Sequence, residues 1–188
     1  MHPFEEDIKK CVSVLEAGGV VLYPTDTVWG LGCDATNAAA VSKIFTIKKR
    51  ADSKAMIVLV TGERDILQYT ASVDLSLFDY LETTTRPTTV IYEHGIGFAD
   101  NLTAADGSIA IRICGDAFCR ALIKRFGKPI VSTSANISGE ATPAHFNAIS
   151  DTIKKQADFV VHHRRNDQTP HQPSSIIRWK DGEVEVIR

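Results

Sequence analysis

Short apolar runs, each bounded by polar or glycine residues, recur along the chain and predict β-strands. The runs GVVLY and MIVLV are continuous, which is typical of strands that are buried on both faces. The run SIAIRI alternates instead, so that Ile109, Ile111 and Ile113 share one face. Strands are therefore expected at residues 19–23, 56–60, 88–92, 108–113, 129–133, 159–161, 174–179 and 183–188.

Segments with helical spacing of their apolar residues separate most of these strands. Residues 37–49 are rich in helix formers, and Gly127 is a plausible end for another amphipathic segment. The last helix is expected to open with Thr142 as its N-cap and Pro143 at its first position. Helices are expected at residues 4–15, 37–49, 63–82 in two pieces, 116–126 and 143–155.

This mixture of strands and helices predicts an α/β fold. We expect a single domain over residues 1–188, built on a twisted, mixed, open sheet. Lys180, Asp181 and Gly182 separate the last two strands, and Asp-Gly is a strong signal for a hairpin turn. The chain shows no internal repeat and no low-complexity tract.

The composition is that of an ordinary globular chain, with 44% hydrophobic and 23% charged residues among 188. No apolar stretch approaches the ~20 residues of a membrane span, and the N-terminus lacks the apolar core of a signal peptide. The four cysteines form neither a C-x-x-C nor a Cys/His metal pattern. We therefore expect a cytoplasmic protein with buried, reduced thiols, no membrane contact and no metal site.

Positive charge is concentrated locally, although the net charge is −2. Residues 43–54 contain five lysine and arginine side chains against Asp52 alone, and HHRR forms a second basic spot at 162–165. The low overall charge argues against broad coating by nucleic acid. The local concentration indicates a specific anionic ligand, with a solvated helix end as the alternative.

The common nucleotide-binding and hydrolase signatures are missing. GKP at 127–129 lacks the partner glycine of a P-loop, and GIGFAD at 95–100 has Asp100 in place of the third glycine of a dinucleotide loop. There is also no G-x-S-x-G nucleophile elbow. A nucleotide site in this chain would have to be unconventional.

Polar residues cluster where the expected strands and helices end, which is where ligand sites of α/β proteins gather. PTDTVWGLG offers the hydroxyls of Thr25 and Thr27 and the carboxylate of Asp26, beside glycines that permit close approach of a ligand. A turn that satisfies its own backbone is the alternative. In KKRADSK the cations could converge on phosphate oxygens or simply complement a helix dipole.

STSANISGEAT at 132–142 is the most unusual segment in composition. Its hydroxyl and amide side chains lie between a buried strand and an expected helix start, a position that suits phosphate or ribose. A polar loop with an ordinary cap at Thr142 is the alternative. The functional interpretation is favoured, because a cap needs one hydroxyl rather than six polar side chains.

Taken in order, YPTDTVWGLGCDA, KKR, STSANISG and PSSII resemble the YrdC-like family of threonylcarbamoyl-AMP synthases over almost the entire chain. The resemblance implies a twisted open α/β sheet around a large, positively lined cavity. It implies that L-threonine, bicarbonate and ATP condense into L-threonylcarbamoyl-AMP and pyrophosphate, with Mg²⁺ bridging phosphates. The product would feed the t6A modification of tRNA, which makes a downstream transferase and a tRNA or double-stranded RNA contact the expected partners.

The motifs of the family also assign roles to individual residues. Lys48 and Arg50 match its K-x-R pair and would be catalytic. The residues that would bind L-threonine are Thr27, Arg112, Ser134 and Ser174, with Arg112 gripping the carboxylate. The residues that would bind ATP are Arg50, Lys54, Ser132, Asn136, Thr142 and Arg188.

Such a reaction requires anions to be held together rather than a nucleophilic side chain. Threonine becomes an N-carboxylate whose oxygen attacks the α-phosphorus, and cations and N–H donors offset the charge as pyrophosphate leaves. The absence of an evident Ser–His–Asp arrangement is consistent with this chemistry.

Departures from the family pattern affect the expected rim of the cavity. Ala51 and Ala55 replace prolines, Arg86 lies in a TRPTT segment that replaces P-G-P-x-T, and Arg178 stands where an aspartate is common.

One alternative function is therefore that of a paralogue that forms a carbamoyl- or acyl-adenylate with another amine. A second is an RNA-binding, ribosome-associated factor without synthase activity, although exposed aromatic residues are sparse. The polar segment 162–173 is a candidate lid over bound nucleotide.

Overall fold

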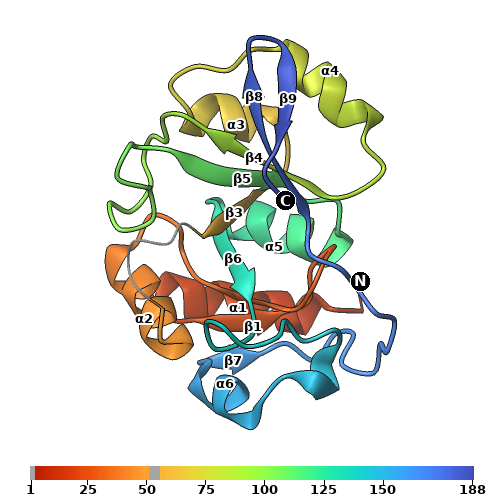
Figure 1. Ribbon diagram of the computed structural model, residues 1–188. Helices are drawn as coiled ribbons and strands as arrows, with labels where there is room; N and C mark the ends of the chain where they lie inside the picture. Colours follow the sequence, from red (N-terminus) through yellow and green to blue (C-terminus); the bar gives the residue numbers. More distant parts are fainter. Residues whose placement is uncertain (1–2, 51–55) are drawn as a thin grey trace.

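A continuous mixed sheet runs through the protein (Figure 1). The structure is a computed structural model and describes residues 3–50 and 56–188. Within these ranges the strands are β1 (Val21–Tyr23), β2 (Gly30–Gly32), β3 (Ile57–Val60), β4 (Thr88–Tyr92), β5 (Ile109–Ile113), β6 (Ile130–Ser134), β7 (Phe159–Val160), β8 (Ser175–Lys180) and β9 (Glu183–Val186). Their order is β7-β1-β2-β6-β3-β5-β4-β8-β9, with both parallel and antiparallel neighbours. The predicted α/β class with a mixed sheet is confirmed.

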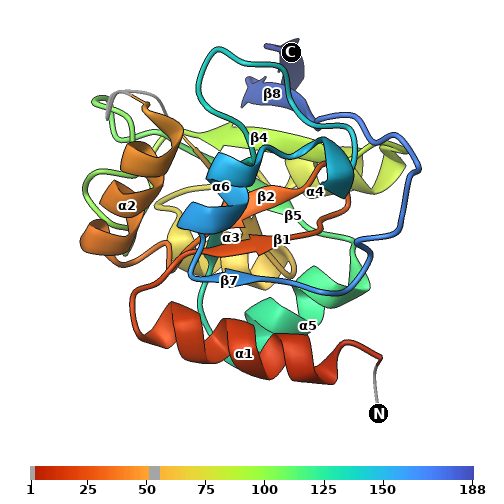
Figure 2. The same ribbon diagram turned by 90° about the horizontal axis from the view of Figure 1, so that it is seen from below.

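Helices pack around this sheet. In the described ranges they are α1 (Glu5–Glu16), α2 (Ala38–Lys48), α3 (Glu63–Tyr69), α4 (Ser76–Thr83), α5 (Ala117–Phe126) and α6 (Asp151–Gln156). Helices α1 and α5 lie side by side, and α2 contacts α6 (Figure 2). Helices α3 and α4 lie at the opposite end of the molecule from α6 (Figure 1). None of the helices in these ranges has the length and apolar character needed to cross a membrane.

Capping residues in the sequence set the boundaries of the two central helices. Asn37 caps α2 by accepting a hydrogen bond from the backbone N–H three residues later at 3.1 Å, and Asp116 caps α5 in the same way at 2.9 Å. Gly127 ends α5 with a φ of 78°, a left-handed conformation that glycine adopts without steric cost. Both helices therefore confirm the prediction for their segments.

The main hydrophobic core includes the helix pair α1–α5 and the strands beside it. Ile8 and Leu15 of α1, Leu22 of β1, and Phe118 and Leu122 of α5 belong to one buried cluster and are each at most 2% exposed. Full burial of such a side chain stabilises a fold by roughly 1.5–3 kcal/mol. Because β1 belongs to this cluster, the packing holds the start of the loop that follows β1 in place.

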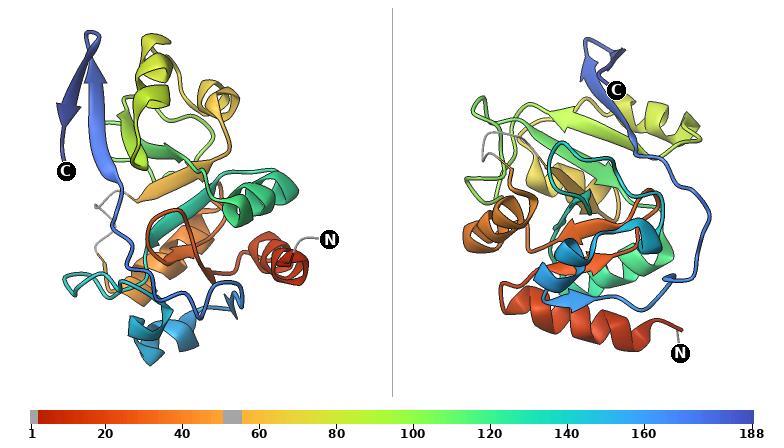
Figure 3. Two further views of the ribbon diagram at one scale, coloured as in Figure 1. Left: turned by 90° about the vertical axis from the view of Figure 1, so that its right-hand side faces the viewer. Right: turned by 60° about the horizontal axis from the view of Figure 1, so that its bottom comes forward.

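The β8–β9 hairpin folds the end of the chain back along β8, at the periphery of the molecule (Figure 3). Asp181 and Gly182 have positive φ values of 52° and 78°, which is the turn predicted from Asp-Gly. Strand β8 runs parallel to β4, and the backbone of Arg188 exchanges hydrogen bonds with that of Ile176 at 2.9 and 3.1 Å. Arg188 therefore lies next to the start of β8.

The stretch after β1 contains a strand that the sequence pattern did not predict. Residues Gly30–Gly32 form β2, which pairs antiparallel with both β1 and β6. Glycine has a low strand propensity, so a three-residue segment with two glycines indicated a loop. Packing requires Gly32, because a Cβ there would lie 2.5 Å from the ring of Tyr23 and 2.6 Å from the carbonyl oxygen of Val131.

The helix predicted for residues 143–155 is wrong in its first half. Phe146–Ala148 form only a short 3₁₀ turn, and α6 begins at Asp151 with Ser150 as its N-cap. Serine followed by an acidic residue in the first turn is a stronger helix start than Thr-Pro at this place. Thr142 therefore does not cap a helix and instead lines a cavity.

The polar segment 162–173 is anchored over its first half. Asp7 accepts hydrogen bonds from the backbone N–H groups of two consecutive histidines at 3.0 and 2.8 Å. Arg164 donates to the carboxylate of Asp116 at 2.8 Å. These contacts tie residues 162–164 to α1 and to the start of α5, while closure of the segment over bound nucleotide stays a prediction.

Packing at β2 leads to a stability prediction. We expect Gly32→Ala to lower the free energy of unfolding by about 1–3 kcal/mol, because the new methyl group overpacks a site enclosed by a ring and a carbonyl. Urea unfolding followed by circular dichroism measures this loss. Gly115→Ala is the matched control, since a Cβ there meets no atom within 4 Å. Equal stability of the two variants would contradict the packing argument.

Candidate active site

Most of the predicted site residues come together at one cavity of about 200 Å³. Its walls come from the loop after β1, from β5 and β6, and from both ends of the β8–β9 hairpin segment. The predicted residues that line it are Thr27, Arg50, Arg112, Ser132, Ser134, Thr142, Ser174 and Arg188. Segments more than a hundred residues apart thus contribute to a single hollow.

The loop after β1 is a rigid turn that presents the hydroxyl of Thr27. Thr25 Oγ1 donates to the carbonyl of Val28 at 2.8 Å and accepts from the backbone N–H of Thr27 at 3.0 Å. Thr27 Oγ1 lies 3.2 Å from a donating guanidinium nitrogen of Arg112. The turn that was the structural alternative for this stretch is present, and it also orients a cavity residue.

Arg112 is the most enclosed cation of the cavity. Its side chain is 3% exposed, and its Nη2 donates to Asp26 Oδ1 at 3.0 Å. The second oxygen of Asp26 accepts the backbone N–H of Gly115 at 3.3 Å. The Nε of Arg112 is buried and has no hydrogen-bond partner within the described residues. A buried donor without a partner costs free energy, so an anion bound beside it would be favoured.

Strand β6 contributes two hydroxyls on one face. Ser132 and Ser134 are two residues apart and both line the cavity. Gly30 of β2 lies opposite Ser134, and a Cβ at Gly30 would come within 3.0 Å of Ser132 Oγ. The glycine therefore leaves room for the serine hydroxyl at the cavity wall.

The end of the chain completes the opposite wall. Ser174 is 4% exposed, and its hydroxyl shares a hydrogen bond of 2.8 Å with Thr89 of β4. Arg188 Nη2 donates to the carbonyl oxygen of Ser174 at 3.2 Å. This contact holds a guanidinium at the cavity beside a buried hydroxyl.

Lys48 and Asn136 do not line the cavity but hold its wall from behind. Lys48 Nζ donates to the carbonyl oxygens of Ser134 and Asn136 at 2.5 and 2.7 Å, and the backbone N–H of Ser138 donates to the carbonyl of Lys48 at 2.8 Å. The amide of Asn136 donates to the carbonyls of Ile137 and Glu140.

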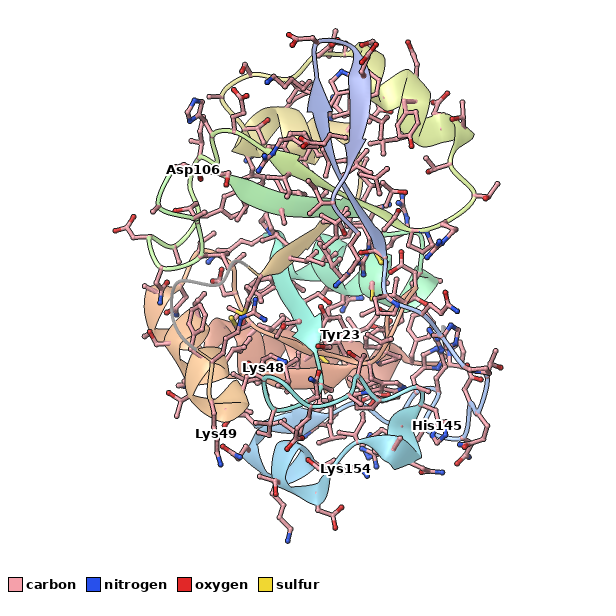
Figure 4. All side chains as sticks on the ribbon, in the orientation of Figure 1. Tyr23, Lys48, Lys49, Asp106, His145 and Lys154 are labelled. Carbon is pink, nitrogen blue, oxygen red and sulfur yellow. The ribbon has the colours of Figure 1, made fainter. Side chains whose placement is uncertain are left out.

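In Figure 4, Lys48 at the end of α2 points toward the interior of the protein, while the next residue, the exposed Lys49, points away from it. The geometry favours a positioning role for Lys48 and Asn136.

The expected rim of the cavity is only partly as the sequence indicated. Arg86 and Arg178 line other surface hollows and not this cavity. Lys54, Ala51 and Ala55 lie outside the described residues. The expectation that Arg86 and Arg178 form part of the cavity rim is therefore wrong.

Sequence reasoning missed the residues that support the cavity from outside. Asp26 was visible as a polar residue but not as the partner of Arg112, since 86 residues separate them. Arg164 belonged to a recognised basic spot, and it donates to the carbonyl oxygen of Thr25 at 3.1 Å. Such long-range partners leave no local signal in the pattern of residues.

A larger crevice of about 750 Å³ lies on the reverse face of the sheet. Its apolar walls include Ile66 of α3, Leu81 of α4, and Val90 and Ile111 of the sheet. Asp26 lines this crevice, but none of the residues assigned to threonine or ATP does, and we assign the chemistry to the smaller, polar cavity. Within residues 3–50 and 56–188 no three His, Cys, Asp or Glu side chains are grouped to hold a metal ion.

Comparison with known proteins identifies the family. The sequence profile of the Sua5/YciO/YrdC family, described as "Telomere recombination", matches residues 13–188. The chain belongs to this family. It is 30% identical over 183 residues to a protein of Pseudoalteromonas translucida named threonylcarbamoyl-AMP synthase, covering 96% of this chain and 97% of that relative.

Two solved structures of the Sua5/YciO/YrdC family share the fold. P. abyssi Sua5 complexed with L-threonine superposes with a TM-score of 0.86 at 20% identity, covering 98% of this chain and 54% of Sua5. E. coli YciO superposes with a TM-score of 0.81 at 23% identity, covering all of this chain and 90% of YciO. The chain thus spans about half the length of Sua5 and most of the length of YciO.

Burial of Lys48 leads to a prediction of pH-dependent stability. Desolvation, and to a smaller extent the charge of Arg50, lowers the pKa of Lys48 from 10.5 to about 8. The unfolded chain keeps this proton up to about pH 10.5, so Lys48 adds stability as the pH rises from about 8, and this contribution is lost as the pH falls through 8. We expect wild type to gain about 2–3 kcal/mol over Lys48→Met between about pH 7.5 and about pH 10.

Urea unfolding at both pH values measures this difference. Lys48→Arg serves as a second variant, because a guanidinium keeps its charge in this pH range and gives no such gain. A difference between wild type and both variants that does not change with pH would show that Lys48 does not titrate there.

Proposed function

We propose that this protein is an L-threonylcarbamoyl-AMP synthase, which forms threonylcarbamoyl-AMP and pyrophosphate from L-threonine, bicarbonate and ATP. The observation that carries the proposal is the buried Nε of Arg112, which lacks a partner within the described residues and lies in a cavity ringed by hydroxyls and two further arginines. A donor of this kind suits a carboxylate, and the arginines suit phosphates.

The threonine half of the cavity is the part around Arg112. Its guanidinium would bind the substrate carboxylate, and the hydroxyls of Thr27, Ser134 and Ser174 would bind the remaining polar groups. All of these residues are held by hydrogen bonds or strand pairing in the protein itself. Pre-organised donors cost little free energy when the ligand binds.

The nucleotide half would use Arg50, Ser132, Thr142 and Arg188. A volume of about 200 Å³ is below the roughly 300–1,000 Å³ of typical ligand pockets. The phosphates would therefore lie in the cavity, and the nucleoside would extend past its rim. Lys54 is proposed as a further ATP contact from the sequence alone.

The chemistry follows from this division. The threonine nitrogen joins the carbon of bicarbonate with loss of water, and an oxygen of the resulting carbamate attacks the α-phosphorus while pyrophosphate leaves. Arg50 and Arg188 would offset the charge that builds up on the phosphates. Lys48, proposed as catalytic from its motif, would act by holding the carbonyls of the β6 loop in place. Mg²⁺ would be bound through the triphosphate.

The comparisons support this proposal. The Pseudoalteromonas relative carries the name of the same activity and is similar over nearly the full length of both chains. The P. abyssi structure of the same fold was solved with L-threonine. A synthase of this kind would act in the cytoplasm, and its product would pass to the transferase that completes t6A on tRNA.

Incorporation of radiolabelled bicarbonate is the decisive test. We expect label in an adenylate product only when ATP and L-threonine are both present, together with release of pyrophosphate. A panel of other amines would reveal a paralogue with a different substrate. Binding of tRNA with a steep salt dependence, but without any turnover, would instead favour an RNA-binding factor.

Two cavity variants test the assignment of residues. We expect Arg50→Ala and Ser134→Ala each to reduce threonine-dependent pyrophosphate release by about 100-fold or more, because each removes a donor from a charged reaction. Arg86→Ala is the matched control, since this arginine lies outside the cavity. Circular dichroism would check the folds, and near-normal turnover in both cavity variants would contradict the assignment.

A further inference from the structure

The cavity has to bind ligands of very different charge within a small volume. L-threonine presents one carboxylate, whereas ATP and pyrophosphate carry several negative charges on phosphates. Arg112 and Arg188 line the same 200 Å³. Because charge–charge attraction scales with the charge of the ligand, two equally bare arginines would both favour phosphates over a carboxylate.

The two arginines differ in their surroundings. Arg112 forms an ion pair with Asp26 at 3.0 Å, and the two side chains are only 3% and 13% exposed. Arg188 donates to a backbone carbonyl, and no ion pair of Arg188 is found within 4.0 Å among the described residues. The charge of the Arg112 guanidinium is therefore largely offset by Asp26, while the Arg188 guanidinium has no acidic side chain paired with it in the described part of the chain.

Asp26 is itself fixed from two sides. Its Oδ1 accepts from Arg112 Nη2, and its Oδ2 accepts the backbone N–H of Gly115 at 3.3 Å. It occupies the Nη2 end of the guanidinium and leaves Nε without a partner in the described part of the chain. A single planar carboxylate can bind at the remaining position, where the orientation of the guanidinium is already set.

From this arrangement we propose that Asp26 is a specificity-determining residue, which reserves the Arg112 end of the cavity for a singly charged carboxylate and excludes phosphates. Its charge weakens the attraction of Arg112 for every anion, and the penalty grows with the negative charge of the ligand. Specificity of this kind arises from repulsion of the wrong ligand as much as from attraction of the right one. The inference rests on the proposed function and names a determinant of its amino-acid specificity.

Competition between L-threonine and inorganic pyrophosphate tests the proposal. Isothermal titration calorimetry would measure the Kd of L-threonine with and without pyrophosphate. In wild type we expect little change, because the two ligands occupy different ends. In Asp26→Asn we expect pyrophosphate to raise the apparent Kd of L-threonine about tenfold or more, since the Arg112 end now accepts phosphates. Asp26→Glu should restore the wild-type behaviour.

Asp34→Asn is the matched control. Asp34 is also an aspartate paired with a cation at 2.9 Å, but that cation, Lys128, does not line the cavity, whereas Arg112 does. We expect this variant to lose stability without any change in the competition. Asp26→Ser serves as a second neutral variant if Asp26→Asn does not fold.

The outcomes separate the two proposals. Failure of wild type to bind L-threonine or to incorporate bicarbonate would overturn the proposed function. Direct titration of pyrophosphate would still test Asp26, because we expect about tenfold tighter binding in the neutral variants than in wild type. Wild-type behaviour of the neutral Asp26 variants in both titrations would overturn the specificity role.

Discussion

A single buried ammonium group ties the end of α2 to the loop after β6. Lys48 Nζ binds the carbonyl oxygens of Ser134 and Asn136, and the backbone of the same lysine receives Ser138 N–H. The ammonium gives the carbonyl of Asn136 a donor and adds a second donor to the carbonyl of Ser134, which also accepts the backbone N–H of Asn136. The direction of Ser134, and with it one wall of the cavity, depends on this contact. The burial that makes Lys48 an effective clamp also lowers its pKa.

The cavity combines hydroxyls that are fixed in position with arginines that differ in how far a neighbouring acidic group offsets their charge. Strand pairing places Ser132 and Ser134, a hydrogen-bonded turn places Thr27, and hydrogen bonding places Ser174. The protein supplies almost no nucleophilic chemistry at this position. It supplies instead a fixed arrangement of donors, which is what a reaction between three anionic or polar substrates needs.

The hydrophobic pattern predicted most strands and helices, because burial and capping act over a few residues. The Asn37 and Asp116 caps and the Asp181–Gly182 turn are examples. β2 was missed because glycine carries no strand signal, and the helix at Thr142 was wrong because a better cap follows eight residues later.

The predicted site was recovered only through its resemblance to a family, and most of its members do line one cavity. The roles of Asp26 and Arg164 could not be predicted, because each is defined by a partner far away in the chain. No periodicity or local motif reports a contact of that kind. The positioning of Lys48 behind the wall, rather than in the cavity, likewise depends on the tertiary fold.

The return of β8 alongside β4 has a consequence for how the protein acquires its activity. Ser174 and Arg188 reach the cavity only after this parallel pairing has closed a loop of more than eighty residues. Loop closure over such distances costs entropy before its contacts form, and non-local pairing slows folding. Binding competence should therefore be among the last properties to appear as the nascent chain folds.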